Sequence, residues 1–92
     1  MKRGDQVRVC PHGESRRSAV ATVAIISENQ LAIGVGFPDK PPFAVNAPGS
    51  MAIHPQLGVM LFAHRETLNG KPWGPWVEIF GGGHYEIEPV EK

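Results

Sequence analysis

Residues 4–9, Gly-Asp-Gln-Val-Arg-Val, and residues 19–35, Ala-Val-Ala-Thr-Val-Ala-Ile-Ile-Ser-Glu-Asn-Gln-Leu-Ala-Ile-Gly-Val, decide the fold of this chain. Val7 and Val9 point to one face of an extended strand and Arg8 points to the other. A β-branched strand follows over 19–26, which is apolar on both faces and therefore expected to be central or buried. A polar turn and a third strand come next. This order predicts the opening of a small, strongly curved antiparallel sheet.

The rest of the chain also favours strands over helices. Gly and Pro make up 20 of the 92 residues and interrupt every segment that could form a helix. The strongest strand candidate is 58–66, which includes Phe62 and is expected to cross the core. Asn69-Gly70 predicts a tight hairpin turn, and shorter strands are expected over 76–80 and 84–88. The sequence therefore predicts one all-β domain over residues 1–92, a closed barrel or curled sheet of five to seven short antiparallel strands.

A proline-rich segment interrupts this pattern at residues 37–50. It contains four prolines, which fix φ and lack a backbone donor. We expect an extended surface loop with a short edge strand over 44–46. Phe37 and Phe43 would then be left near the surface.

Charge is balanced overall but uneven along the chain. Nine Lys and Arg residues match nine Asp and Glu residues, yet residues 1–17 carry a net charge of +3 and residues 78–92 a net charge of −3. One interpretation is a basic face for nucleic acid, formed by Lys2, Arg3, Arg8, Arg16 and Arg17. The other, which we favour because first and last strands often pair in small barrels, is that the two ends lie side by side or meet across a subunit interface.

The lone cysteine and the hydropathy pattern bear on location. Cys10 is the only cysteine, so a disulfide within the chain is excluded and a reducing compartment is indicated. No apolar run approaches the roughly 18 residues that span a bilayer, and the charged N-terminus is unlike a signal peptide. These features predict a cytoplasmic protein with no membrane partner.

Residues with catalytic or metal-binding chemistry are present but not in a typical spacing. The histidines are His12, His54, His64 and His84. No two of them have metal-ligand spacing, so neither a metal site nor a cofactor is expected. Cys10 and His12 lack an orienting carboxylate nearby, so no catalytic residue is assigned.

Two carboxylates allow a further interpretation. Glu66 and Glu78 could form a polar cluster with His64 and Arg65 at one rim. Alternatively, Glu78 simply alternates outward along its strand.

The most suggestive local feature is Trp73-Gly74-Pro75-Trp76. We expect Trp76 to fill the core and Trp73 to lie in a turn, partly exposed. Exposed aromatic side chains on stiff loops are typical of peptide contacts. The candidate ligand-binding residues are Trp73, Trp76, Phe43 and Tyr85. The alternative is that both tryptophans cap the open end of a barrel.

Residues 4–36 resemble the opening of SH3-like small barrels. The matching segments are 4–9 and Ala-Thr-Val-Ala-Ile-Ile at 21–26, with Ala21 in place of the usual glycine. The resemblance implies an SH3-like barrel of the kind that contacts proteins or nucleic acids. The opening also looks like that of plasmid-borne trimethoprim-resistant reductases, but their active-site motif is not recognisable here. The chain is similar in character to small bacterial or mobile-element proteins.

Together these features predict a small non-enzymatic binding module for a protein or peptide. The alternatives are a nucleic-acid-binding barrel that uses the basic N-terminal segment, and a small oligomeric enzyme with a site built at the subunit interface. We also expect a homo-oligomer, most simply a dimer, because so short a chain cannot readily bury all its aromatic side chains. Its contact would use the proline loop from Phe37 to Phe43 or the Trp73 turn.

Overall fold

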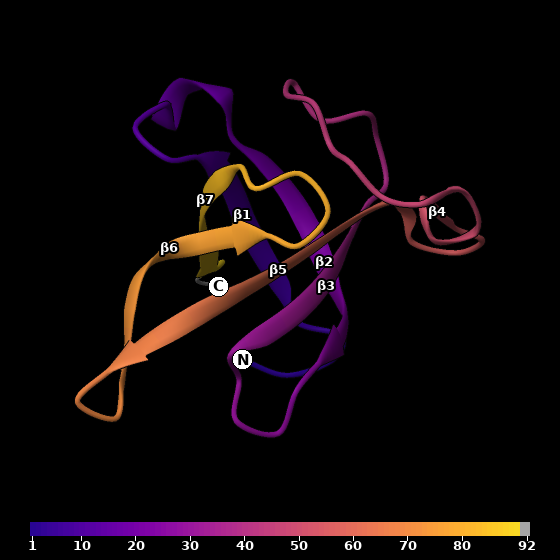
Figure 1. Cartoon of the computed structure of the whole chain (residues 1–92). Helices are drawn as coiled ribbons and strands as arrows, with labels where there is room; N and C mark the ends of the chain where they lie inside the picture. The colour runs from indigo at the N-terminus through magenta and orange to yellow at the C-terminus, as the bar shows by residue number, and fades with distance from the viewer. Residues whose placement is uncertain (91–92) are drawn as a thin grey trace.

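Antiparallel strands account for most of residues 1–90, the part of the chain that the computed structural model describes (Figure 1). The strands within this range are β1 (Gln6–Pro11), β2 (Ala19–Ile26), β3 (Ala32–Phe37), β4 (Ile53–His54), β5 (Gly58–Leu68), β6 (Lys71–Glu78) and β7 (His84–Pro89). Two single-turn 3-10 helices, η1 (Ser15–Arg17) and η2 (Gly49–Met51), lie between them. The prediction of an all-β fold is therefore confirmed.

The sheet closes on itself. Its order is β3-β2-β1-β7-β6-β5-β4, and β3 also pairs with β5, so six of the strands in residues 1–90 form a closed barrel and β4 adds to its edge. In Figure 1 the long β5 runs diagonally across the barrel. This architecture is consistent with a small SH3-like barrel, as predicted. The first and last strands do pair, with Arg8 of β1 opposite Glu88 of β7.

Alternate side chains along the strands point into the barrel, where they form one hydrophobic core. The buried apolar side chains are Val7, Val9, Ala21, Val23, Ile33, Val35, Phe37, Phe43, Leu61, Ala63, Trp76, Tyr85 and Ile87. The sequence suggested that β2 is buried on both faces, and this is wrong. Val20 and Ile25 are 42% and 59% exposed, because nothing covers the outer face of a single-layered barrel there.

Most of the proline-rich segment is the surface loop that the sequence predicts, but its two phenylalanines are buried. Phe37 ends β3 and is 1% exposed, and Phe43 is 8% exposed. Their rings meet edge to face with centroids 5.6 Å apart. Residues 44–46 form no strand. We call residues 38–48 the strap, since they fold back onto the barrel and insert Phe43 into the core.

The β5–β6 hairpin is longer than expected. Asn69 and Gly70 have φ of 53° and 78°, which confirms the predicted tight turn. β6 begins at Lys71, so Trp73 lies in a strand and not in a turn. The pairing is irregular, because His64 lies opposite Val77 whereas Glu66 lies opposite Trp73. Between these two pairs β6 has more residues than β5, and Gly74, at φ 71°, is one of them.

Candidate functional site

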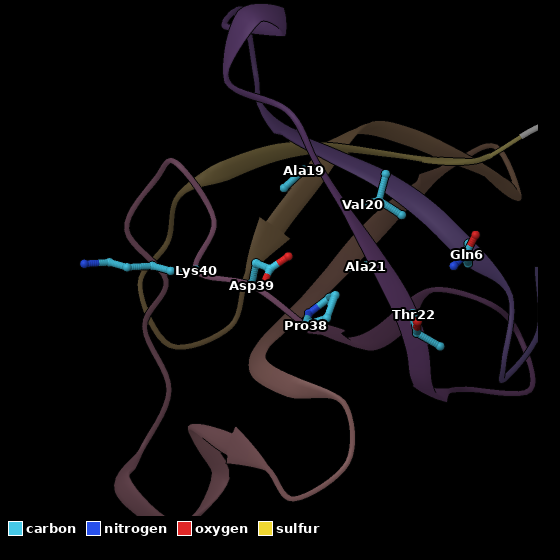
Figure 2. A pocket seen from close by; sticks show the side chains of 8 residues that line it. All are labelled: Gln6, Ala19, Val20, Ala21, Thr22, Pro38, Asp39 and Lys40. Atoms are coloured by element: carbon cyan, nitrogen blue, oxygen red, sulfur yellow. The ribbon is translucent and has the colours of Figure 1, made fainter.

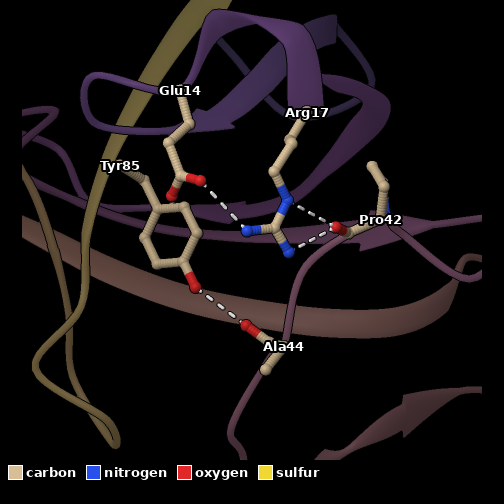
Figure 3. Close-up of polar contacts among 5 residues, drawn as sticks. All are labelled: Glu14, Arg17, Pro42, Ala44 and Tyr85. Atoms are coloured by element: carbon tan, nitrogen blue, oxygen red, sulfur yellow. Dashed lines mark hydrogen bonds and ion pairs between the residues drawn. The ribbon is translucent and has the colours of Figure 1, made fainter.

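Side chains from distant parts of the chain hold the strap in place (Figure 3). The Arg17 guanidinium donates from Nε and Nη2 to the Pro42 carbonyl oxygen at 2.9 and 2.7 Å, and from Nη1 to Glu14 at 3.1 Å. The Tyr85 hydroxyl donates to the Ala44 carbonyl oxygen at 2.9 Å. Burial, and then the nearby Glu78 carboxylate, raise the pKa of Tyr85 above its usual 10.0, so the phenol remains a donor.

Glu78 supplies a further anchor. Its side chain is 2% exposed and accepts hydrogen bonds from the Asn46 backbone N–H at 2.8 Å and from Asn46 Nδ2 at 3.3 Å. The interpretation that Glu78 alternates outward is wrong, since it shares the inner face of β6 with Trp76. Glu66 is exposed and lies opposite Trp73, whereas Glu78 lies opposite Ala63. The expected cluster of the two carboxylates is therefore not formed.

The four predicted ligand-binding aromatics do not form one surface. Trp76, Tyr85 and Phe43 are 5%, 6% and 8% exposed and belong to the core. The prediction that Phe43 presents a binding face is wrong, because the strap turns its ring inward against Tyr85, with centroids 5.5 Å apart. Trp73 is 56% exposed, which confirms its expected partial exposure.

The basic residues of the N-terminal segment are exposed but not gathered. Lys2 and Arg3 precede β1, Arg8 lies within it, and Arg16 and Arg17 follow it. A six-residue strand is about 20 Å long, so these charges are spread along that length. Arg8 faces Glu88 across the β1–β7 ladder, and Arg17 is engaged by the strap.

Cys10 lies opposite Glu86 in the β1–β7 ladder. Burial, and then the carboxylates of Glu86 and Glu88, raise the pKa of Cys10 above its usual 9.0, so the thiol stays protonated at neutral pH. His12 is engaged instead with Glu86, with Nδ1 2.5 Å from Oε1. Among residues 1–90, no three His, Cys, Asp or Glu side chains are grouped to hold a metal ion. The same range contains no helix long and apolar enough to cross a membrane.

A hollow on the outer face of the barrel contains the exposed indole. It has a volume of about 360 Å³, and we call it the Trp73 hollow. Its lining residues are His12, Glu66, Trp73, Gly74, Pro75, Val77 and His84. Trp73, Pro75 and Val77 make an apolar wall, and the remaining side chains form a polar rim. The hollow thus combines apolar contact area with a few polar groups, which is typical of binding sites.

The irregular hairpin pairing explains why these residues meet. In a regular ladder that continued from His64 and Val77, Glu66 would face Pro75. The extra residues of β6 around Gly74 place Trp73 there instead. Pro72 and Pro75 also deprive this strand of backbone donors. This strand therefore offers a ligand fewer backbone donors than a strand without proline.

A second hollow, of about 230 Å³, lies between β2 and the start of the strap (Figure 2). Its lining residues are Gln6, Ala19, Val20, Ala21, Thr22, Pro38, Asp39 and Lys40. Figure 2 shows the Lys40 side chain pointing away from the others. With small side chains and no aromatic residue, this hollow offers less contact area than the Trp73 hollow.

Comparison with known proteins finds no counterpart for this chain. No protein family, no curated protein and no solved structure matches it.

Proposed function

We propose that the protein is a non-enzymatic binding module that holds a segment of a protein or peptide at the Trp73 hollow. The observation that carries this proposal is the indole of Trp73, 56% exposed beside a hollow of about 360 Å³. Tryptophan dominates many binding interfaces because its large rigid surface is buried at little entropic cost. A paired strand holds Trp73 in place, which lowers that cost further.

The neighbouring residues favour a peptide over the alternatives. Glu66 lines the hollow and Glu86 contacts its His12, so carboxylates would repel a phosphate backbone. Catalysis is disfavoured because the Cys10 thiol stays protonated and the strap encloses Glu78. The lone, half-buried thiol fits a reducing compartment, so we propose that the module acts in the cytoplasm.

Peptide selection tests the proposal. We expect a displayed random-peptide library, panned on the wild-type protein, to yield peptides whose affinity falls about 30-fold or more in Trp73→Ala, the effect typical of a dominant interface residue. Leu68→Ala is the matched control, because Leu68 is also 56% exposed and lies near the tip of the same hairpin. It should bind the selected peptides as the wild type does. Isothermal titration calorimetry measures each affinity.

Two outcomes would contradict the proposal. Selected peptides that bind Trp73→Ala as tightly as the wild type would place the contact elsewhere. Tight binding of labelled DNA or RNA that weakens steeply with salt would favour the nucleic-acid alternative instead.

We also propose that the protein forms a homodimer, although not through the proline loop, whose Phe37 and Phe43 are buried. An uncharged patch on the opposite side of β5 from the core offers a better contact. It comprises Ile25, Gly34, Phe62 and Phe80. Phe62 packs over Gly34, and its ring centroid lies 5.8 Å from that of Phe80. Depletion of charge is characteristic of homodimer interface cores.

Sedimentation equilibrium checks the dimer. We expect a mass near twice the 10.0 kDa of one chain at micromolar concentration, and a shift toward monomer in Phe80→Ser. Ile53→Ser is the control, since Ile53 is 70% exposed but lies in β4, outside the patch. A wild-type mass near 10.0 kDa that does not change on concentration would rule out the dimer. A dimer lost instead in Trp73→Ala would assign the hollow to self-association.

A further inference from the structure

We infer that the Trp73 hollow selects a positively charged side chain of its partner, an arginine or lysine whose alkyl stem lies on the indole. This inference rests on the proposed function and specifies the chemistry of the ligand. It is carried by the placement of one carboxylate beside one exposed indole.

Glu66 is the carboxylate. It lies directly opposite Trp73 in the β5–β6 ladder, and both side chains line the hollow. Side chains paired in this way have Cβ atoms about 4.5–5.5 Å apart. The Glu66 side chain is exposed, and within residues 1–90 it forms neither an ion pair nor a hydrogen bond. Its charge is therefore free to meet a cation that lies over the indole.

The other polar and charged groups near the hollow are also compatible with a positively charged ligand. Glu86 holds His12 at the rim, with Nδ1 2.5 Å from the carboxylate oxygen. His84 completes the rim. The nearby cations are Arg65, whose Nε donates to the Gly74 carbonyl oxygen at 3.0 Å, and Lys71, which lies opposite Leu68 at the hairpin tip; neither is in the lining. The lining itself thus contains one carboxylate, that of Glu66, and neither a lysine nor an arginine.

An indole next to a carboxylate matches each part of a basic side chain. The ring face attracts the cation, the carboxylate neutralises it, and the methylene stem packs on apolar surface. Pro75 and Val77 supply that surface in the hollow. The chain already contains such a contact, since the Arg65 guanidinium lies 5.7 Å from the ring centroid of Trp76. The Trp73 side chain is 56% exposed and can take such a contact from a ligand, whereas the Trp76 side chain is 5% exposed.

The experiment compares two small probes by NMR titration of the ¹⁵N-labelled protein. Nα-acetyl-arginine N-methylamide carries the cation, and Nα-acetyl-citrulline N-methylamide is its neutral isostere. We expect the arginine probe to shift the Trp73 indole resonance saturably, with a dissociation constant on the order of millimolar. The shifts should include the backbone amides of Val77 and His84. The citrulline probe should bind at least about fivefold more weakly.

Matched variants assign the effect to Glu66. Glu66→Gln should weaken the arginine probe about fivefold or more, because it removes the charge and preserves the shape. Glu88→Gln is the control, since Glu88 is an exposed carboxylate on β7 outside the hollow. It should leave the affinity unchanged. The dispersion of the same spectra verifies that each variant is folded.

Several results would overturn the inference. Equal affinity for the citrulline probe, equal affinity in Glu66→Gln, or no saturable shift of the Trp73 indole would each do so. Peptides that depend on Trp73 but are not enriched in Arg or Lys would overturn this inference while the proposed function stands. The absence of any Trp73-dependent peptide would overturn both.

Discussion

Replacing Phe37 by alanine is expected to lower the free energy of unfolding by about 3–5 kcal/mol. The side chain is 1% exposed at the end of β3, and its ring packs edge to face on Phe43 of the strap. The substitution removes a large apolar contact and leaves a cavity where the strap meets the barrel. Urea denaturation followed by far-UV circular dichroism measures the loss.

Phe62→Ala provides the comparison. Its position on the strongest predicted strand suggested a core residue, but Phe62 lies opposite Gly34 on the outer face and is half-buried. Truncation there should cost the monomer less than about 2 kcal/mol, since only part of the ring is removed from water within one chain. If the two alanine variants lost equal stability, the assignment of Phe37 to the core and Phe62 to the outer face would be wrong.

The second large effect is expected at Gly58. This glycine begins β5 with φ 91°, and a Cβ there would overlap the Phe37 carbonyl oxygen and lie 3.3 Å from Pro38 Cα. Gly58→Ala should therefore cost at least about 3 kcal/mol, through backbone strain and displacement of the strap from β5. Thermal unfolding monitored by circular dichroism, together with urea denaturation, measures this cost.

Gly49→Ala is the matched control for Gly58→Ala. A Cβ at Gly49 meets no atom within 4 Å, so its stability should change by less than about 0.5 kcal/mol. Near-wild-type stability of Gly58→Ala would show that β3 and β5 do not approach as closely as described.

Local sequence patterns predict the barrel but not the strap. The alternation of Val7 and Val9 around Arg8 and the Asn69-Gly70 turn depend on neighbouring residues, and both are present in the structure. The strap depends on contacts across the chain. Arg17 lies 25 residues from Pro42, and Tyr85 lies 41 residues from Ala44. No local pattern signals such pairs, so the sequence predicts Phe43 near the surface whereas the structure buries it.

Local sequence patterns also predict only part of the candidate site. A tryptophan beside a Gly-Pro pair is visible in the sequence, and its partial exposure is confirmed. Its partnership with Glu66 was missed, because simple alternation across the hairpin would pair Glu66 with Pro75. Only the extra residues of β6 around Gly74 bring Glu66 opposite Trp73. The sequence predicts a turn at Gly74, before the strand expected over 76–80, and so gives no signal of an irregularity within a strand.

Chemical-shift mapping of a peptide selected on the wild-type protein tests most directly whether the Trp73 hollow is the binding surface. The largest shifts in the ¹⁵N-labelled protein are expected on residues that line the hollow, namely His12, Glu66, Trp73, Val77 and His84. Shifts centred instead on Lys2, Arg3, Arg8 and Arg16, or on the hollow beside β2 in Figure 2, would contradict it.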